Sequence, residues 1–389
     1  MKDKKLYNLI KKEEKRQIKT INLIASENYI SSGVSKALAS VFTNKYAEGY
    51  SGARYYAGNK VVDELEELTK KRALSLFIKK PEEQAKWRVN VQPYSGSPAN
   101  VAVFHATIPL GSKIMAMGLS MGGHLTHGSK PNITGKLWKQ IPYGVNRKTE
   151  RINYKEIMKI AKKEKPKIII AGGSAYSRII DFKNFKKIAD TIEAIFMVDM
   201  SHFAGLVAGG VYPSPFLYAD IVTTTTHKTL RGPRGAIIFS KTKFSGAIDK
   251  VIFPGLQGGP HENQIAGIAA ALFEAHQPSF KIYAKQIVKN AKILSQELKK
   301  MGWKVISQGT DTHLFLVDTY SRGISGKIAS DILEKNKIIV NKNMIPYDTR
   351  SPLDPSGIRI GTAAVTTKGM KEKDMKHIAH KIDIILKSI

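Results

Sequence analysis

Hydrophobic and polar positions follow two different periods along much of the chain, and this predicts strands and helices in turn. Apolar runs at 168–176, 194–200 and 221–226 are short and rich in β-branched residues, which is typical of buried strands. Longer segments with helical spacing, such as 182–187, lie between them. Alternation of this kind from about residue 89 to 240 favours an α/β fold with a mostly parallel sheet and crossover helices.

The pattern changes after this region. Residues 262–300 are alanine-rich and helical in spacing, and we expect them to bridge into a smaller C-terminal α/β domain. The start of the chain has the pattern of an amphipathic helix. The expected strands of the small domain are WKVIS (303–307), THLFLVD (312–318) and KIIVNKN (337–343). The predicted regions are an N-terminal arm (1–50), a large domain (51–280) and a small C-terminal domain (281–389).

Composition narrows the function classes. The 389 residues include no cysteine, which excludes disulfides and thiol nucleophiles, and nothing in the sequence predicts a metal site. The longest apolar runs are shorter than the roughly 18 residues of a membrane span, so a cytoplasmic location is the default expectation. A net charge of +30 would attract polyanions, but the lysines are scattered and not interleaved with aromatic residues. Nucleic-acid binding is therefore the less favoured explanation of the charge.

Lys228 occupies a setting suited to covalent chemistry, at the end of a strand and before a turn rich in Gly and Pro. Lysine attacks carbonyls only as the free amine, so its pKa of about 10.4 must be lowered by burial or by nearby cations. His227, Arg231 and Arg234 are the nearby cations in the sequence. Taken alone, Lys228 is as easily a solvated surface residue, since the chain has 62 Lys and Arg residues.

Two upstream features give Lys228 its context. Asp199 ends a buried strand, and in parallel sheets ligands bind just beyond the carboxyl ends of the strands. Ser95, Gly96 and Ser97 precede a helical pattern, where hydroxyl and backbone N–H groups suit an anion. An ordinary helix cap is the commoner explanation of such a triplet taken alone. Together the three features supply what a pyridoxal-phosphate enzyme needs for phosphate, ring nitrogen and aldehyde.

Eight motifs, in order along nearly the whole chain, make the sequence resemble the serine hydroxymethyltransferases. The resemblance implies an aspartate-aminotransferase-like fold with a mostly parallel, mixed, seven-stranded sheet. It also implies reversible conversion of L-serine and tetrahydrofolate to glycine and 5,10-methylenetetrahydrofolate. The motifs are LIASENY (23–29), TNKYAEGY (43–50), RYYAGN (54–59), GGHLTHG (122–128), VDMSH (198–202), TTTTHKTLRGPRG (223–235), FPGLQGGP (253–260) and SGIRIGT (356–362).

The resemblance assigns the cofactor residues. Lys228 would hold pyridoxal phosphate as an internal aldimine, and Asp199 would keep the ring nitrogen protonated. The other implied cofactor contacts are Gly96 and Ser97 at the phosphate, His124 on the ring face, and Ser174 and His202 near the ring oxygen. His227, next to the lysine, is a further catalytic candidate.

Substrate recognition and proton transfer are assigned in the same way. Arg359 offers a planar fork for the carboxylate of the amino acid, with Ser26 as a second contact. Glu48, set among tyrosines, is the implied proton shuttle. Family members form this site across a homodimer. The residues expected to line it or to reach the neighbouring subunit are Tyr46, Glu48, Tyr56, Gly258 and Gly259.

The folate contacts are the part where this chain departs most from the family pattern. Leu353 replaces an aromatic residue, and Met121 stands where many members have histidine. A folate-independent β-hydroxy amino acid aldolase is an alternative, because the same aldimine would support cleavage of threonine-like substrates. The net charge of +30 leaves a basic nucleic-acid-binding protein that has kept the fold but lost turnover as another. The implied folate contacts are Leu119, Gly123, His124, Leu125, Asn343, Ser351, Pro352 and Leu353.

Overall fold

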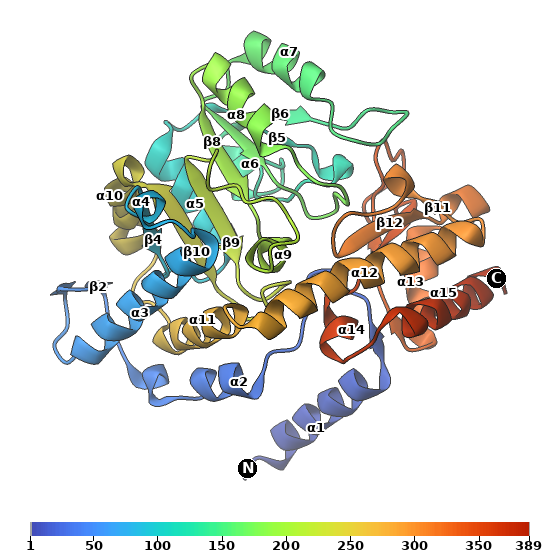
Figure 1. Ribbon diagram of the computed structural model, residues 1–389, viewed down its shortest axis with the longest axis horizontal. Helices are drawn as coiled ribbons and strands as arrows, with labels where there is room; N and C mark the ends of the chain where they lie inside the picture. Colours follow the sequence, from blue (N-terminus) through green and yellow to red (C-terminus); the bar gives the residue numbers. More distant parts are fainter. Residues whose placement is uncertain (1, 389) are drawn as a thin grey trace.

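A seven-stranded sheet forms the centre of the molecule in the computed structural model, which describes residues 2–388 (Figure 1). The strand order is β4-β10-β9-β8-β7-β5-β6, and β10 is antiparallel to both of its neighbours. The other strands therefore all run in one direction, and their carboxyl ends meet at one edge. The strands are β4 (Trp87–Asn90), β5 (Lys113–Met117), β6 (Lys139–Tyr143), β7 (Ile168–Ala171), β8 (Ile195–Asp199), β9 (Ile221–Thr225) and β10 (Ala236–Lys241).

The sheet is buried on both faces, which explains why its strands are apolar throughout and not alternating. Ile168 and Ile170 of β7 join one apolar cluster, whereas Ile169 and Ala171 join the other. Helices α5 (Gly96–Thr107) and α10 (Thr242–Lys250) contribute to the first cluster. Among the helices that contribute to the second are α3 (Lys60–Phe77), α7 (Tyr154–Glu164), α8 (Phe182–Thr191), α9 (Ala204–Ala208) and α11 (Glu262–Ala275).

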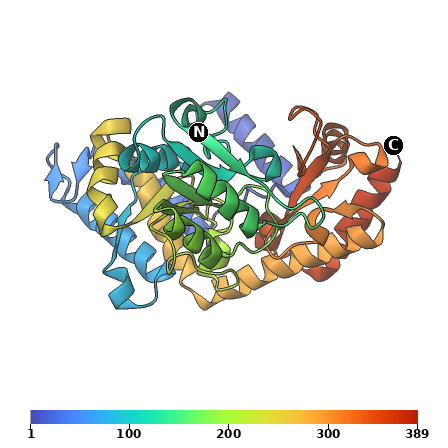
Figure 2. The ribbon, with the colours of Figure 1, turned by 90° about the horizontal axis from the view of Figure 1, so that it is seen from above.

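A second, four-stranded antiparallel sheet has an apolar cluster of its own. Helix α12 (Pro278–Lys300) contacts α9 and α11 beside the large sheet and α14 and α15 beside the small one, and it connects the two parts in both views (Figures 1 and 2). The strands in order are β11 (Lys304–Val305), β12 (Leu314–Asp318), β15 (Gly357–Gly361) and β14 (Asn341–Asn343), with helices α13 (Gly326–Lys335), α14 (Ala363–Thr367) and α15 (Glu372–Lys387).

The N-terminal segment joins the two parts from the other side. Helix α1 (Lys4–Lys19) has no buried residue and protrudes from the body of the molecule (Figure 1). Strand β1 (Ile21–Asn22) then pairs in parallel with β13 (Ile338–Ile339). The remaining elements are α2 (Ser32–Leu38), η1 (Val41–Asn44), β2 (Gly49–Tyr50), β3 (Ala53–Arg54), α4 (Pro81–Gln84), η2 (Leu119–Met121), α6 (Ile133–Leu137), η3 (Val251–Leu256), η4 (Ile306–Gln308) and η5 (Tyr320–Arg322).

The predicted mixed seven-stranded sheet is confirmed, but two predicted strands are wrong in detail. The segment 337–343 forms two strands in different sheets, because β13 pairs with β1 and β14 pairs with β15. The strand at 168–176 ends at Ala171. Gly172 follows with φ +146°, and a Cβ there would lie 2.3 Å from the carbonyl oxygen of Asp199, so the chain turns away where the two strand ends meet. The limits of the three regions stay a prediction.

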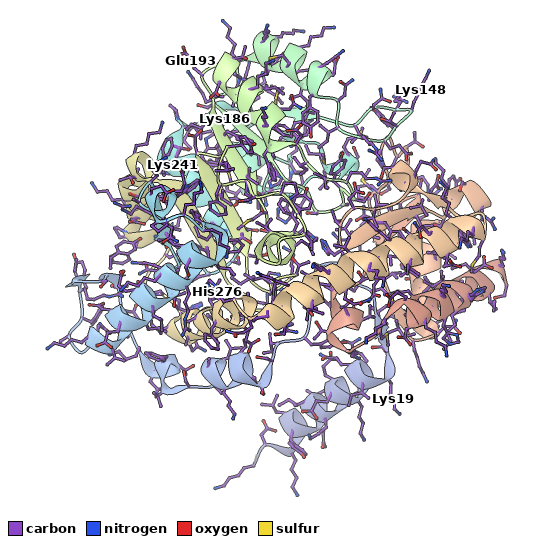
Figure 3. The ribbon with its side chains drawn as sticks, in the orientation of Figure 1. Lys19, Lys148, Lys186, Glu193, Lys241 and His276 are labelled. Carbon is purple, nitrogen blue, oxygen red and sulfur yellow. The ribbon has the colours of Figure 1, made fainter. Side chains whose placement is uncertain are left out.

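Basic side chains are dispersed over the surface. Of the labelled lysines, Lys19, Lys148 and Lys186 lie on widely separated parts of the molecule, whereas Lys241 lies close to Lys186 (Figure 3). This distribution agrees with a generally solvated, lysine-biased surface. Among residues 2–388, no helix combines the length and the apolar character needed to cross a membrane.

Candidate active site

A cavity lies at the carboxyl ends of β7, β8 and β9, opposite the start of α5. It holds about 590 Å³ of empty space, part of it open to solvent. The lining residues are Ser95, Gly96, Ser97, Asn100, His124, His127, Gly173, Ser174, Asp199, Ser201, His202, Thr225, His227, Lys228 and Arg234.

Lys228 is a buried amine at the centre of this group, only 9% exposed. Its Nζ donates a hydrogen bond to Thr225 Oγ1 at 3.1 Å. Burial lowers its pKa to about 8, and the positive charges of Arg359 and Arg234 act in the same direction, against the opposing charge of Asp199. About a tenth of Lys228 is therefore the free, nucleophilic amine at pH 7, far more than for an unperturbed lysine.

The cations around Lys228 are not all those predicted. Arg234 is one of them, but burial lowers the pKa of His227 to about 3, so this histidine is neutral. Arg231 is directed elsewhere: its Nη2 lies 3.7 Å from Glu274 Oε2, and its guanidinium lies 4.8 Å from the ring centre of Tyr283. The predictions of His227 and Arg231 as activating cations are therefore wrong.

Asp199 is a buried anion at the end of β8. Burial alone would raise its pKa, but hydrogen bonds from His127 and the Ser201 backbone hold the pKa of Asp199 well below its usual range. Its Oδ2 lies 3.0 Å from His127 Nε2 and accepts a bond from Asn100 Nδ2 at 2.9 Å. The sequence analysis missed His127 and Asn100, although His127 is the second histidine of GGHLTHG.

The start of α5 is open to an anion. Ser95 stands at the N-cap position, but its side chain makes no capping hydrogen bond. A Cβ on Gly96 would lie 2.7 Å from Thr225 Cγ2, so only glycine allows the helix to begin this close to β9. The first N–H groups of a helix have no partner within the helix, and its dipole favours negative charge there. The ordinary cap is therefore not formed, and the phosphate cup is the better interpretation of this triplet.

Arg359 is a buried cation on β15, 9% exposed. Its Nη1 donates to the carbonyl oxygen of Ser174 at 2.6 Å, and its Nε donates to Asn341 Oδ1 at 3.0 Å. Burial lowers its pKa to about 10. Within residues 2–388 no carboxylate forms an ion pair with Arg359. A buried guanidinium with only neutral partners is suited to bind an anionic ligand.

Ser26 is brought to the same side of β15 as Arg359. Residues 359 and 361 of a strand face the same way. A Cβ on Gly361 would lie 2.4 Å from the Cα of Ala25, and Gly361 N donates to the carbonyl oxygen of Leu23 at 2.8 Å. The chain at Ala25 therefore packs directly on this face, and Ser26 follows it.

Three histidines near the cavity are neutral. Burial lowers the pKa of His124 to about 4, and its Nδ1 lies 2.7 Å from Thr126 Oγ1. His202 Nδ1 lies 3.3 Å from His313 Nε2, and burial lowers the pKa of both rings, that of His313 to about 3. Neutral rings act by stacking or by single hydrogen bonds, not as charges. His313 was missed because it lies far from the quoted motifs.

A second cluster contains the residues that were predicted to line the shared site or to reach the neighbouring subunit, and it lies outside the Lys228 cavity. Tyr46 and Tyr56 are 56% and 48% exposed, and their rings meet edge to face at 5.0 Å. Tyr46 Oη donates to Glu48 Oε1 at 3.3 Å. Cβ atoms on Gly258 and Gly259 would lie 3.1 Å from Glu48 Oε1 and 3.7 Å from the Tyr46 ring. These five residues form one partly exposed group, here called the Glu48 cluster.

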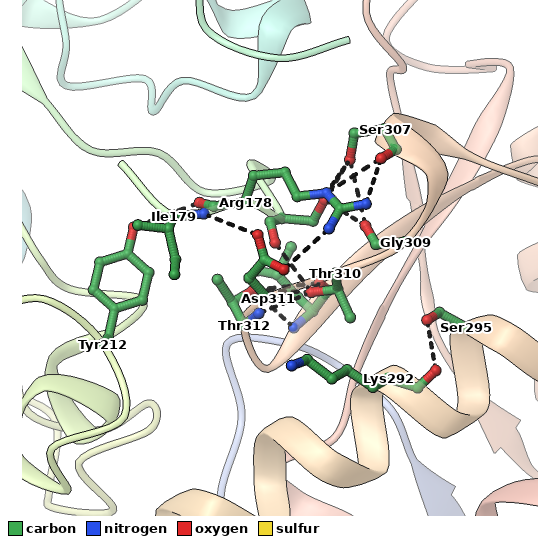
Figure 4. A network of polar contacts seen from close by, with 12 residues as sticks. Arg178, Ile179, Tyr212, Lys292, Ser295, Ser307, Gly309, Thr310, Asp311 and Thr312 are labelled. Atoms are coloured by element: carbon green, nitrogen blue, oxygen red, sulfur yellow. Dashed lines mark hydrogen bonds and ion pairs between the residues drawn. The ribbon is translucent and has the colours of Figure 1, made fainter. Parts of the chain in front are cut away.

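The loop that carries Ser174 is held to the small sheet by the network in Figure 4. Arg178 Nη1 donates to Asp311 Oδ1 at 3.0 Å, and Asp311 N donates to the carbonyl oxygen of Ser177 at 2.9 Å. Arg178 also donates to the carbonyl oxygen of Ser307. These bonds fix the loop between Arg359 and the cavity, so both parts of the fold shape the site.

Two of the segments that carry predicted folate residues reach the hydrogen-bond partners of Arg359. The carbonyl oxygen of Ser174 accepts a hydrogen bond from Arg359. The N–H of Ser174 donates to the carbonyl oxygen of Gly122 at 2.7 Å, beside Gly123. On the other side, Asn341 leads directly to Asn343 along β14. The exposed residues of the set are Leu119 (38%), Leu125 (45%) and Leu353 (76%), with Ser351 and Pro352 also exposed.

Fold and cavity together define a class of protein. A mixed seven-stranded α/β sheet, with a buried lysine, an anchored aspartate and an anion cup at one edge, is the arrangement of the fold-type I pyridoxal-phosphate enzymes. A family model described as serine hydroxymethyltransferase matches residues 1–382 of the 389. The chain belongs to the serine hydroxymethyltransferase family, and it is a pyridoxal-phosphate-dependent transferase of one-carbon metabolism.

Proposed function

We propose that this protein reversibly transfers the hydroxymethyl carbon of L-serine to tetrahydrofolate, giving glycine and 5,10-methylenetetrahydrofolate. The observation that carries the proposal is the pairing of a buried amine with a buried guanidinium that has no carboxylate partner among residues 2–388. An amino-acid substrate needs both groups: the amine of Lys228 lies near the place of its own amine, and the guanidinium of Arg359 can bind its carboxylate. Family membership supplies serine, glycine and folate as the substrate class.

The residues of the cavity match the chemical groups of pyridoxal phosphate. The free N–H groups at Gly96 and Ser97 suit its phosphate, and the carboxylate of Asp199 suits its protonated ring nitrogen. The neutral ring of His124 suits stacking, and Lys228 suits the aldehyde. When bound, the cofactor would draw electrons away from the Cα of an amino acid joined to it through the amine.

The protein's own groups then orient the substrate and move protons. Arg359, with Ser26 beside it, would bind the carboxylate and so fix which Cα substituent stands over the ring. Lys228 Nζ, once free, would hold or return a proton close to Cα. His202 and Ser174 would hold the side of the cofactor ring that carries the ring oxygen.

Glu48 is the proposed proton carrier for the hydroxymethyl group, and we propose that it acts in the site of a second copy. In one chain it lines a different pocket, with Tyr55 and the segment 253–258, and not the Lys228 cavity. A carboxylate on the exposed Glu48 cluster therefore needs a partner surface to reach a lysine. This supports a homodimer with shared sites, in which folate binds beside Arg359.

The test compares serine cleavage by the purified enzyme with and without tetrahydrofolate. We expect glycine to form at a useful rate only with folate, and Lys228→Ala to abolish it. Lys148→Ala, which changes an exposed lysine, is the matched control. Equal cleavage without folate would instead support the folate-independent aldolase, and no cleavage in either condition would contradict the proposal.

A further inference from the structure

The side chain of Arg54 forms hydrogen bonds to the backbone on both sides of Glu48. It lies on β3, and its side chain is only 5% exposed. Its Nη1 donates to the carbonyl oxygens of Ala47 at 2.9 Å and Gly49 at 2.8 Å, the two residues that flank Glu48. Gln92 Nε2 donates to the Gly49 oxygen as well, at 3.0 Å. The backbone conformation at Glu48 therefore depends on the positions of the Arg54 and Gln92 side chains.

The guanidinium of Arg54 is itself held by two carboxylates of α3. Its Nε donates to Asp63 Oδ1 at 2.8 Å, and its Nη2 lies 3.1 Å from Glu66 Oε1. Asp63 and Glu66 are three residues apart and so share one face of the helix. Glu66 is fully buried and also accepts a hydrogen bond from Gln92 Nε2 at 3.0 Å. Glu66 thus holds both of the side chains that bind Gly49.

A further buried carboxyl group, that of Glu262, interacts with Glu66 of this network. It is 1% exposed, in the first turn of α11, which packs against α3. A helix start favours the ionised form, yet burial and the charge of Glu66 raise the pKa of Glu262 to about 9. No donor side chain or backbone N–H within residues 2–388 bonds either of its carboxyl oxygens. The two carboxyl groups can bond each other only while one keeps a proton.

The charges that act on Glu262 come from two elements. Arg54 of β3 lowers its pKa, whereas Glu66 and Asp63 of α3 raise it. Helices α2 and α12 and the turn η1 also pack against α11. The turn η1 has no charged residue, and Lys36 of α2 and Lys281, the first charged residue of α12, are exposed. Ionisation of Glu262 would therefore place an additional negative charge beside a single arginine that already serves two carboxylates.

We propose that Arg54 is a positioning residue for Glu48, and that Glu66 and Glu262 share one proton that keeps the guanidinium in place. The inference rests on the proposed function, because that function is what gives Glu48 its role. None of Arg54, Glu66 and Glu262 lines the Lys228 cavity. Their effect on the reaction is transmitted through the backbone at Ala47 and Gly49.

Arg54→Lys tests the positioning role. A single ammonium cannot reproduce the four contacts of the guanidinium, so Glu48 should shift, and a shift of about 1 Å can cost about 10²-fold in rate. We expect kcat for folate-dependent serine cleavage to fall by about that factor, with the serine KM and the cofactor absorbance unchanged. Arg322→Lys, an exposed arginine of the small sheet region, is the matched control.

Glu262→Gln tests the shared proton, because its amide donates to Glu66 at any pH. At neutral pH we expect Glu262→Gln to be about as active as the wild type. Above about pH 9 we expect kcat to fall less in Glu262→Gln than in the wild type. Thermal stability gives a readout independent of turnover. An unfolded glutamate loses its proton near pH 4.3 and the folded Glu262 near 9, so the contribution of Glu262 to wild-type stability falls with rising pH between these values. Glu262→Gln should reduce that fall, while Glu297→Gln, a variant of an ion-paired glutamate on α12, should not.

The outcomes separate the two proposals. A wild-type enzyme without folate-dependent cleavage would contradict the proposed function. If the wild type is active, an unchanged kcat in Arg54→Lys would overturn the positioning role. Equal losses of kcat, cofactor and thermal stability in that variant would overturn it too, since they would indicate a structural role alone. Parallel pH profiles for wild type and Glu262→Gln would overturn the shared proton.

Discussion

The site around Lys228 and Arg359 and the Glu48 cluster hold their proposed reacting groups in opposite surroundings. Lys228, Asp199 and Arg359 are each less than a tenth exposed, and every one of them has its pKa displaced. Tyr46 and Tyr56 are about half exposed. Chemistry that depends on a lowered lysine pKa needs the dry interior of one chain. The proton carrier stands on the surface, where a second subunit can complete its environment.

The two regions are also built differently. The cavity brings together residues that follow β4, β7, β8 and β9, so it exists only when the large sheet is complete. The Glu48 cluster comes mainly from one segment, 46–56, held by the loop at 258–259. A cavity formed by several strands is rigid, whereas a surface segment needs clamps such as Arg54.

The largest expected effect tests whether the two regions work in trans. Lys228→Ala and Glu48→Gln should each abolish most of the activity, the latter by about 10²- to 10⁴-fold for a lost proton carrier. Co-expression with two different tags allows hybrid dimers to be purified. One site of the hybrid carries both changes and the other none, so we expect about half the wild-type activity per dimer. A hybrid as inactive as its parents would show that each chain uses its own Glu48.

A smaller effect is expected from Arg359→Lys, which keeps the charge but loses the fork. A lost hydrogen bond between charged groups costs about 1.5–3 kcal/mol, so the serine KM should rise by about 10- to 100-fold. Cofactor absorbance should stay unchanged, because Arg359 is assigned to the substrate. The matched control is Arg322→Lys, and an unchanged serine KM in Arg359→Lys would remove the carboxylate role.

The smallest effect is a pH dependence of cofactor loading. Since burial lowers the pKa of Lys228 to about 8, the rate of loading should rise with pH and level off above about 8. An unfolded lysine titrates near 10.4, so the stability of the cofactor-free protein should also rise between about pH 8 and 10.4. Stopped-flow absorbance checks the first, and thermal unfolding the second. A loading rate still rising at pH 10 would mean that Lys228 is not desolvated.

The large sheet could be predicted from the sequence because its strands are buried on both faces and are therefore almost wholly apolar. The segment 337–343 could not be divided correctly, because its two halves find partners, β1 and β15, that are far away in sequence. Local pattern carries no information about such pairings.

The site shows the same limit. Lys228, Asp199 and Arg359 are all buried, as their proposed roles require, but their partners His127, Asn100 and Asn341 lie in other segments. His227 shows the same limit for charge: it is adjacent to Lys228 in sequence, yet burial lowers its pKa to about 3, so it is not a cation beside the lysine, and its catalytic role stays a prediction. Sequence proximity identifies residue types, whereas charge state depends on burial, which only the fold determines.

The most direct test of the account is to reduce the purified enzyme with sodium borohydride in the presence of pyridoxal phosphate and to locate the label by peptide mass spectrometry. The account predicts one dominant labelled residue, Lys228, and loss of that label in Lys228→Ala. A label spread over surface lysines, or unchanged in Lys228→Ala, would contradict it.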